Sequence, residues 1–174
     1  VLVVGVAAGG RELLRPLSPF VAPAGQAGGA VAGPGRDEIK AQFTQVRSVA
    51  ELDHLLANTN RPVMLDFYAD WCVSCIEMEK FTFSDPGVAG QMSQLLLVQA
   101  DVTKNTDEDR ALLKRFNLFG PPGIIFFDAQ GQQLADARVI GFKSARDFGV
   151  VLDRVLTGRG GSSSPLDGLL SLTR

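Results

Sequence analysis

Residues 63–75 read Val-Met-Leu-Asp-Phe-Tyr-Ala-Asp-Trp-Cys-Val-Ser-Cys and contain Cys72 and Cys75, the only two cysteines of the 174-residue chain. The apolar run 63–69 predicts a buried strand that carries one carboxylate, Asp66. The residues after Cys75 have the composition of a helix, which we expect to run to about residue 83. A closely spaced cysteine pair between a strand and a helix is the usual setting of a redox motif.

Working outward from this stretch, short strand and helix patterns alternate along the chain. We expect strands at 43–47, 63–69, 95–102, 124–128 and 138–142, and helices that begin near Ser48, Cys72, Pro86, Asn105 and Ser144. The turn at 129–132 predicts that the last two strands pair as an antiparallel hairpin. This order of elements predicts an α/β fold with a mixed central sheet and helices on both of its faces.

The two ends of the chain differ in composition from its middle. Residues 9–36 are rich in glycine and proline, and residues 158–164 are rich in glycine and serine. Such segments bury too little apolar surface to repay their ordering entropy. We therefore expect a linker up to residue 36, one folded domain over residues 37–157, and a flexible tail over 158–174. The apolar residues 1–8 are interpreted either as the end of a transmembrane helix or as an apolar leader, because they are too short to span a bilayer.

Composition and charge exclude several classes of function. The formal net charge is −2 and no basic stripe is present, so we expect no nucleic-acid partner. Two cysteines are too few for a disulfide-stapled scaffold or a four-thiolate zinc site. We expect neither a cofactor nor a bound metal.

The spacing of the cysteines suits thiol–disulfide exchange. Cysteines at i and i+3 in the first turn of a helix lie near the separation that a disulfide requires. Unpaired N–H groups and the helix dipole stabilise a thiolate at that position. We therefore expect Cys72 to be the exposed nucleophile and Cys75 to be the shielded thiol that resolves the mixed disulfide.

Three other interpretations of the pair remain open at this point. A static disulfide would stabilise the fold little, because it closes a very short loop. A metal-carrying module would need more ligands than a CxxC pair supplies, and the only histidine, His54, is expected on a solvated helix face. A structural domain tethered to a membrane would need no redox chemistry.

Two carboxylates and one proline are further candidates for the site. Asp66 lies within an apolar run, where an unpaired carboxylate is costly, and Glu79 lies one helical turn after Cys75. If both lie beneath the pair, they can exchange protons with the thiols and raise the pKa of each thiol. Otherwise Asp66 is a surface residue and Glu79 pairs with a lysine. Pro122, in a Gly-Pro-Pro-Gly break, is either a cis X–Pro residue or part of a plain rigid turn.

Taken together, these residues resemble the thioredoxin superfamily, in which WCxxC follows a strand and a cis-proline loop faces the pair. The closer resemblance is to the C-terminal periplasmic domain of the DsbD family of thiol:disulfide interchange proteins. It covers roughly residues 40–157 and rests on four stretches: 68–75, 77–86, 112–116 and 126–128. Gly123 departs from the pattern, because the family often has threonine after the proline, and Pro121 precedes that proline here.

The resemblance implies a protein-disulfide reductase domain on the periplasmic side of the bacterial inner membrane. Such a domain takes electrons from a transmembrane domain and reduces an N-terminal periplasmic domain of the same protein, and through it isomerases and cytochrome-maturation proteins. By position, Cys72 is the nucleophile, Cys75 is the resolving thiol, Asp66 and Glu79 tune the pair, and Pro122 is the cis-proline. The resemblance also favours the membrane-helix interpretation of residues 1–8. A general or cytochrome-c-maturation reductase is the alternative.

Overall fold

In the computed structural model, which describes residues 34–158, five strands form one sheet in the order β1-β3-β2-β4-β5. The strands β1 to β5 span Thr44–Gln45, Val63–Tyr68, Leu96–Asp101, Gly123–Phe127 and Val139–Ile140. Strands β1, β2 and β3 are parallel, whereas β4 is antiparallel to both β2 and β5. The predicted mixed sheet is confirmed. The predictions for residues 1–33 and 159–174 concern segments outside the described range.

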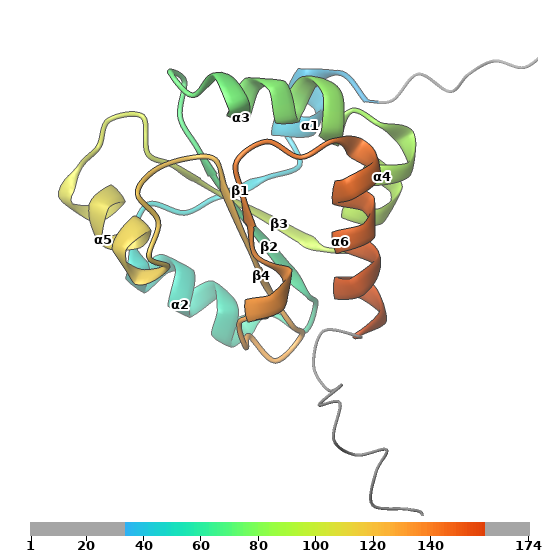
Figure 1. The fold of residues 1–174 in the computed structure, drawn as a ribbon. Coiled ribbons are helices and arrows are strands. Elements are labelled where there is room, and N and C mark those ends of the chain that lie inside the picture. The colour runs from blue at the N-terminus through green and yellow to red at the C-terminus, as the bar shows by residue number, and fades with distance from the viewer. Residues whose placement is uncertain (1–33, 159–174) are drawn as a thin grey trace, which may run out of the picture. The chain divides into compact units, whose positions relative to one another are not determined.

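Helices cover both faces of this sheet (Figure 1). Their bounds are α1 Arg36–Lys40, α2 Val49–Asn58, α3 Val73–Glu77, α4 Pro86–Met92, α5 Asp107–Arg115 and α6 Ala145–Thr157, with a π-helix η2 at Met78–Phe83 and a 3₁₀ helix η3 at Ala135–Ala137. Helices α2 and α5 pack on one face, and α1, η2, α4 and α6 pack on the other. No helix within residues 34–158 is long and apolar enough to cross a membrane.

Strand β2 lies at the centre of the sheet and supplies both halves of the core. Leu65 and Phe67 pack with the α2 and α5 side, whereas Met64 packs with the α4 and α6 side. Because side chains alternate along a strand, Asp66 shares the face of Met64. All six residues of β2 are buried, which explains why the strand is an apolar run without alternation.

The helix expected from Cys72 to residue 83 has two kinds of winding. The α-helical part, α3, gives way at Met78 to the π-helix η2, which ends at Phe83 as predicted. A π-helix forms i→i+5 hydrogen bonds and therefore has a wider turn than an α-helix. The buried residues of this segment are Met78, Glu79, Thr82 and Phe83. The prediction of one uniform α-helix was therefore wrong, although the buried positions, Glu79 among them, keep the spacing of one helical face.

Three other elements differ from the prediction. Helix α1 was not expected, because it begins at Arg36, the last residue of the predicted linker. Strand β1 has only two residues, since the chain pairs with β3 only at Thr44 and Gln45. The final hairpin is looser than expected: after the bridge between Phe127 and Gln133, the 3₁₀ helix η3 intervenes before β5 returns beside β4. The antiparallel return itself is confirmed.

Candidate redox-active site

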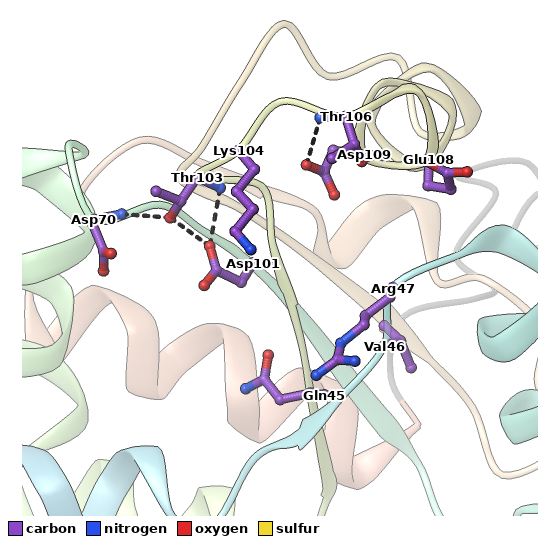
Figure 2. A pocket seen from close by; sticks show the side chains of 10 residues that line it. All are labelled: Gln45, Val46, Arg47, Asp70, Asp101, Thr103, Lys104, Thr106, Glu108 and Asp109. Carbon is purple, nitrogen blue, oxygen red and sulfur yellow. Dashed lines mark hydrogen bonds between the residues drawn. The ribbon is translucent and has the colours of Figure 1, made fainter.

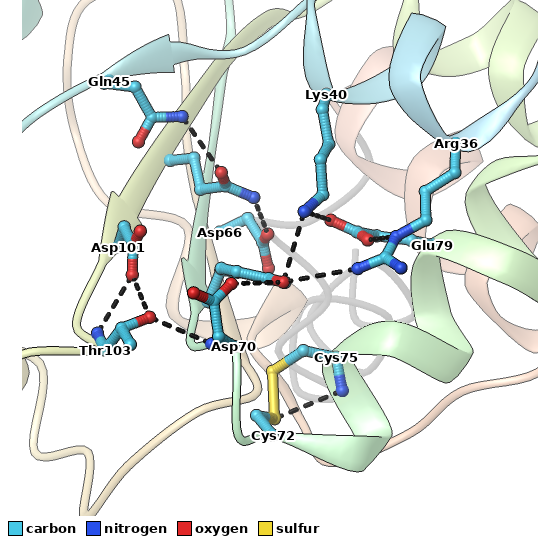
Figure 3. A network of polar contacts seen from close by, with 12 residues as sticks. Arg36, Lys40, Gln45, Asp66, Asp70, Cys72, Cys75, Glu79, Asp101 and Thr103 are labelled. Carbon is cyan, nitrogen blue, oxygen red and sulfur yellow. Dashed lines mark hydrogen bonds and ion pairs between the residues drawn. A yellow bond between two sulfur atoms is a disulfide. The ribbon is translucent and has the colours of Figure 1, made fainter.

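The two cysteines are joined in a disulfide where β2 leads into α3 (Figure 3). Cys72 is the N-cap residue of α3, and its Sγ accepts a hydrogen bond of 3.2 Å from the backbone N–H of Cys75. The two Cα atoms are 5.3 Å apart, within the usual range for a disulfide. A sulfur that already accepts a helix N–H is in the position that stabilises a thiolate after reduction.

The expected difference in exposure between the two cysteines is not present in this disulfide state. Cys72 is 6% exposed and Cys75 is 4% exposed, so the prediction of an exposed Cys72 was wrong for the bonded form. The reason is local: the Cys72 sulfur turns back over the first turn of α3, where it meets both the Cys75 N–H and the Cys75 sulfur. The neighbouring side chains Trp71 and Val73 are exposed instead.

Asp66 is buried at the centre of β2, with 4% of its surface exposed. Its Oδ2 accepts a hydrogen bond of 3.0 Å from the side-chain amide of Gln99 on β3. The oxygen of that amide accepts a bond of 3.0 Å from Gln45 on β1, which fixes its orientation. Burial raises the pKa of Asp66 to about 7, opposed by the Gln99 bond and aided by the charge of Glu79. Asp66 is therefore not a surface residue, and it can exchange protons near neutral pH.

Glu79 is buried in η2, and two cations from α1 approach it. Its Oε2 accepts a hydrogen bond of 2.6 Å from Nε of Arg36, and its Oε1 lies 3.8 Å from Nζ of Lys40. Oε1 has no hydrogen-bond partner among the described residues. The alternative that Glu79 pairs with a lysine is thus correct in part, but the ion pair is a buried feature of the site and not a surface contact.

The structure brings the two carboxylates and the disulfide into one region (Figure 3). Sγ of Cys75 lies 3.9 Å from the backbone oxygen of Phe67, the residue after Asp66. Glu79 follows Cys75 by four residues along α3 and η2, and its charge acts on Asp66. Asp66 on β2 and Glu79 on η2 thus belong to two different elements of this region.

The loop before Cys72 is held by a chain of hydrogen bonds. The Tyr68 hydroxyl donates to Oδ1 of Asp70 at 3.0 Å, and the backbone N–H of Asp70 donates to the Thr103 hydroxyl at 2.9 Å. The Thr103 hydroxyl in turn donates to Asp101, and the Trp71 indole N–H donates to the backbone oxygen of Thr103. These bonds attach the loop to the segment after β3, so the first cysteine is presented from a fixed backbone.

Pro122 follows Pro121 through a cis peptide bond, which decides between the two interpretations that the sequence left open. The pairing of Gly123 with Phe67 places this proline at the end of the sheet where β2 leads toward Cys72. The glycine that follows this proline, Gly123, has little space for a side chain, because a Cβ atom there would lie 2.8 Å from Cδ2 of Leu118. Leu118 therefore occupies the space that a threonine at position 123 would need.

A polar cavity of about 650 Å³ lies beside this loop (Figure 2). Its lining combines both signs of charge and includes Arg47, Asp70, Asp101 and Lys104. Neither cysteine borders it, so the redox chemistry takes place outside this cavity. Within residues 34–158 no group of three or more His, Cys, Asp and Glu side chains is arranged to hold a metal ion, and His54 is exposed on α2.

The sequence analysis missed the partners of both carboxylates. Gln99 carried a usable signal, since it is polar within the apolar run 95–102, as Asp66 is within 63–69. The two residues are direct neighbours in the parallel register of β2 and β3. Arg36, the last residue of the predicted linker, and Lys40 carried only their helical i, i+4 spacing.

Comparison with known proteins agrees with this geometry. A family model described as a thioredoxin-like domain matches residues 50–156. The chain belongs to the thioredoxin-like family. Within that family, the oxidised C-terminal domain of Neisseria meningitidis DsbD has 35% sequence identity and a TM-score of 0.54, covering 64% of this chain and 99% of that domain. A thioredoxin from Thermus thermophilus shares the fold at 24% identity and a TM-score of 0.54, covering 69% of this chain and 91% of that chain.

The thioredoxin-like domain also has relatives among complete DsbD proteins. The thiol:disulfide interchange protein DsbD of Ralstonia nicotianae is 52% identical over 159 residues, which is 90% of this chain and 25% of that protein. DsbD of Escherichia coli K12 is 52% identical over 107 residues, covering 61% of this chain and 19% of that protein. The chain thus spans about a quarter or less of the DsbD proteins that it matches. This homology, the fold and the bonded pair Cys72–Cys75 support thiol–disulfide exchange and protein-disulfide reductase activity.

Proposed function

We propose that this domain relays electrons as the C-terminal domain of a DsbD-type protein, on the periplasmic side of the bacterial inner membrane. It receives them from a transmembrane domain and passes them to an N-terminal periplasmic domain or to another periplasmic thiol–disulfide protein. The observation that carries the proposal is the bonded Cys72–Cys75 pair at the end of β2, in a chain that covers 99% of the Neisseria DsbD C-terminal domain.

The relay consists of two exchange reactions on the same pair. In the first, two electrons from the donor dithiol reduce the Cys72–Cys75 disulfide, and the donor cysteines become a disulfide. In the second, the Cys72 thiolate attacks a partner disulfide, the S–S bond of the partner breaks, and its leaving sulfur takes up a proton. The Cys75 thiol then loses its proton and attacks Cys72 Sγ, which releases the reduced partner and restores the intramolecular disulfide.

Asp66 and Glu79 serve as the acidic groups that tune the pair in this proposal. Asp66 has a pKa of about 7, so it can accept the proton of the Cys75 thiol and return it in the next cycle. Two negative charges near the thiols also raise the pKa of each thiol, which favours a pair that gives up electrons readily. Pro122 and its cis bond border the site at the start of β4, where a partner backbone can approach the disulfide.

The test uses the reduced domain and the oxidised N-terminal domain of Ralstonia nicotianae DsbD as the partner. Cys75→Ser leaves Cys72 without its resolving thiol, so we expect a stable mixed disulfide that dithiothreitol releases. Cys72→Ser should give no adduct and should abolish reduction of the partner. Both adducts and rates can be read by mass spectrometry and by gel mobility after thiol alkylation.

Insulin, an unrelated disulfide substrate, separates the relay from a general reductase. Much faster reduction of the DsbD N-terminal domain than of insulin supports the relay, whereas equal rates contradict it. Stoichiometric zinc binding that persists in mild oxidant would replace it with the metal-carrying interpretation. Undiminished partner reduction by Cys72→Ser would refute the role of the pair altogether.

A further inference from the structure

Helix α1 supplies the cations of the site, although it precedes β1 and lies far from the cysteines in the sequence. Nε of Arg36 lies 2.6 Å from Oε2 of Glu79, and Nζ of Lys40 lies 3.8 Å from Oε1. Glu79 is 2% exposed, whereas the two cationic side chains are 43% and 35% exposed. The buried carboxylate is therefore balanced by charges that reach it from the surface.

The same cations also contact the strand that leads to Cys72. The Tyr68 hydroxyl accepts hydrogen bonds from Arg36 at 3.4 Å and from Lys40 at 3.2 Å, and Nζ of Lys40 lies 4.5 Å from the centre of the Tyr68 ring. The same hydroxyl donates a hydrogen bond to Asp70, which lies two residues before Cys72. Helix α1 thus holds the Glu79 side of the pair and the loop before it at the same time (Figure 3).

We infer that Arg36 is a positioning residue for the redox reaction, which acts on the cysteine pair by fixing and balancing the buried carboxylate of Glu79. Reduction creates a thiolate in a site that already contains Glu79 and Asp66. A buried carboxylate without a counter-ion opposes the formation of a second negative charge nearby, and the guanidinium reduces that opposition. Lys40 is the weaker partner, since it is more distant from Glu79 and shared with Tyr68.

The groups that contact Glu79 or act on its charge are consistent with this role. Arg36 and Lys40 approach it from α1, and Asp66 and Tyr68 lie on β2. The bond to Glu79 raises the pKa of Arg36 above its ordinary value, so the guanidinium remains charged throughout the working range of the thiols. Arg36 is the only cation that an atom of Glu79 meets at hydrogen-bond distance among the described residues.

The test is the pH profile of iodoacetamide alkylation of Cys72 in the fully reduced domain. For Arg36→Gln we expect the profile to move to higher pH, with alkylation roughly threefold to tenfold slower below its midpoint. Arg36→Lys, which keeps the charge, should lie close to the parent. Arg115→Gln is the matched control, because it removes a surface ion pair of the same length, to Asp53, and should leave the profile unchanged.

A double-mutant cycle with Glu79→Gln tests whether Arg36 acts through Glu79. Without the carboxylate, the half-exposed Arg36 is free to move into solvent, where its charge is screened, so Arg36→Gln should then change the profile little. An unmoved profile for Arg36→Gln, an equal shift in the Glu79→Gln background, or an equal shift for Arg115→Gln would each overturn the inference. The inference uses the proposed role of Cys72 as the attacking thiol, but alkylation needs no partner protein, so failure of the relay would be seen separately.

Discussion

Asp66 and Glu79 are buried to nearly the same degree, at 4% and 2% exposure, but their carboxylates are stabilised by different kinds of hydrogen-bond donor. Asp66 accepts its hydrogen bond from a neutral amide, Gln99, whereas Glu79 accepts one from the guanidinium of Arg36. A neutral donor satisfies the oxygen but does not offset the desolvation of a charge, and a cation does both. Burial, with only a neutral donor opposing it, raises the pKa of Asp66 to about 7.

The largest effect is expected for Asp66→Asn, which removes the uncompensated carboxylate. The pKa of Asp66 is raised to about 7 in the folded protein, so its contribution to stability is complete below about pH 4 and is lost as the pH rises through 7. The variant should therefore exceed the parent by about 2–4 kcal/mol in free energy of unfolding at pH 8 and by little at pH 4. Guanidinium chloride unfolding of the oxidised proteins at both pH values measures this.

The exposed Asp136→Asn is the control for this experiment and should change neither value by more than about 0.5 kcal/mol. A stability difference for Asp66→Asn that is the same at pH 4 and pH 8 would contradict the assignment of a raised pKa. In the reduced protein, the same variant should lower the pKa of the thiols, and an unchanged thiol titration would remove Asp66 from the proposed mechanism.

An intermediate effect is expected for Gln99→Leu, which removes the neutral donor and leaves Asp66 in place. The buried oxygen loses its hydrogen bond, which should cost about 1–3 kcal/mol of stability at pH 8. The pKa of Asp66 should rise further above 7, because the lost bond favoured the charged form. Carbon-detected NMR titration of the Asp66 carboxyl measures the shift, with the exposed Gln130→Leu as the control. A fall in the pKa of Asp66 would show that Gln99 does not stabilise the carboxylate.

The smallest effect is expected for Glu79→Gln, observed at Asp66. The charge of Glu79 is the weakest of the three influences on Asp66, so the pKa of Asp66 should fall only slightly from about 7 when that charge is removed. The same NMR titration reads this change, and the exposed Glu108→Gln should have no effect. If the pKa of Asp66 instead fell all the way to that of an ordinary aspartate, the charge of Glu79, and not burial, would be what raises it.

Local patterns in the sequence were sufficient to predict the redox pair and most of the elements around it. An apolar run, a turn and a helix pattern place Cys72 and Cys75 at a strand-to-helix junction, because periodicity and helix capping act over a few residues. Asp66 was a candidate for the same reason: one carboxylate in an apolar run is visible without a structure. The cis bond before Pro122 was open from the sequence, since cis and trans X–Pro bonds differ little in energy.

The partners of these residues depend on contacts between distant segments. Arg36 reaches Glu79 across 43 residues and Gln99 reaches Asp66 across 33, and no local pattern encodes either pairing. Met78 and Phe83 of η2 pack in the core with residues of α1, α4 and α6, and the π winding of this segment was not predicted from the sequence. The sequence alone identified the candidate thiols and carboxylates, because these groups are properties of single residues. The pKa of Asp66 and the ion pair of Glu79 were decided only by the tertiary structure, since solvation and pairing depend on which groups lie next to each carboxylate.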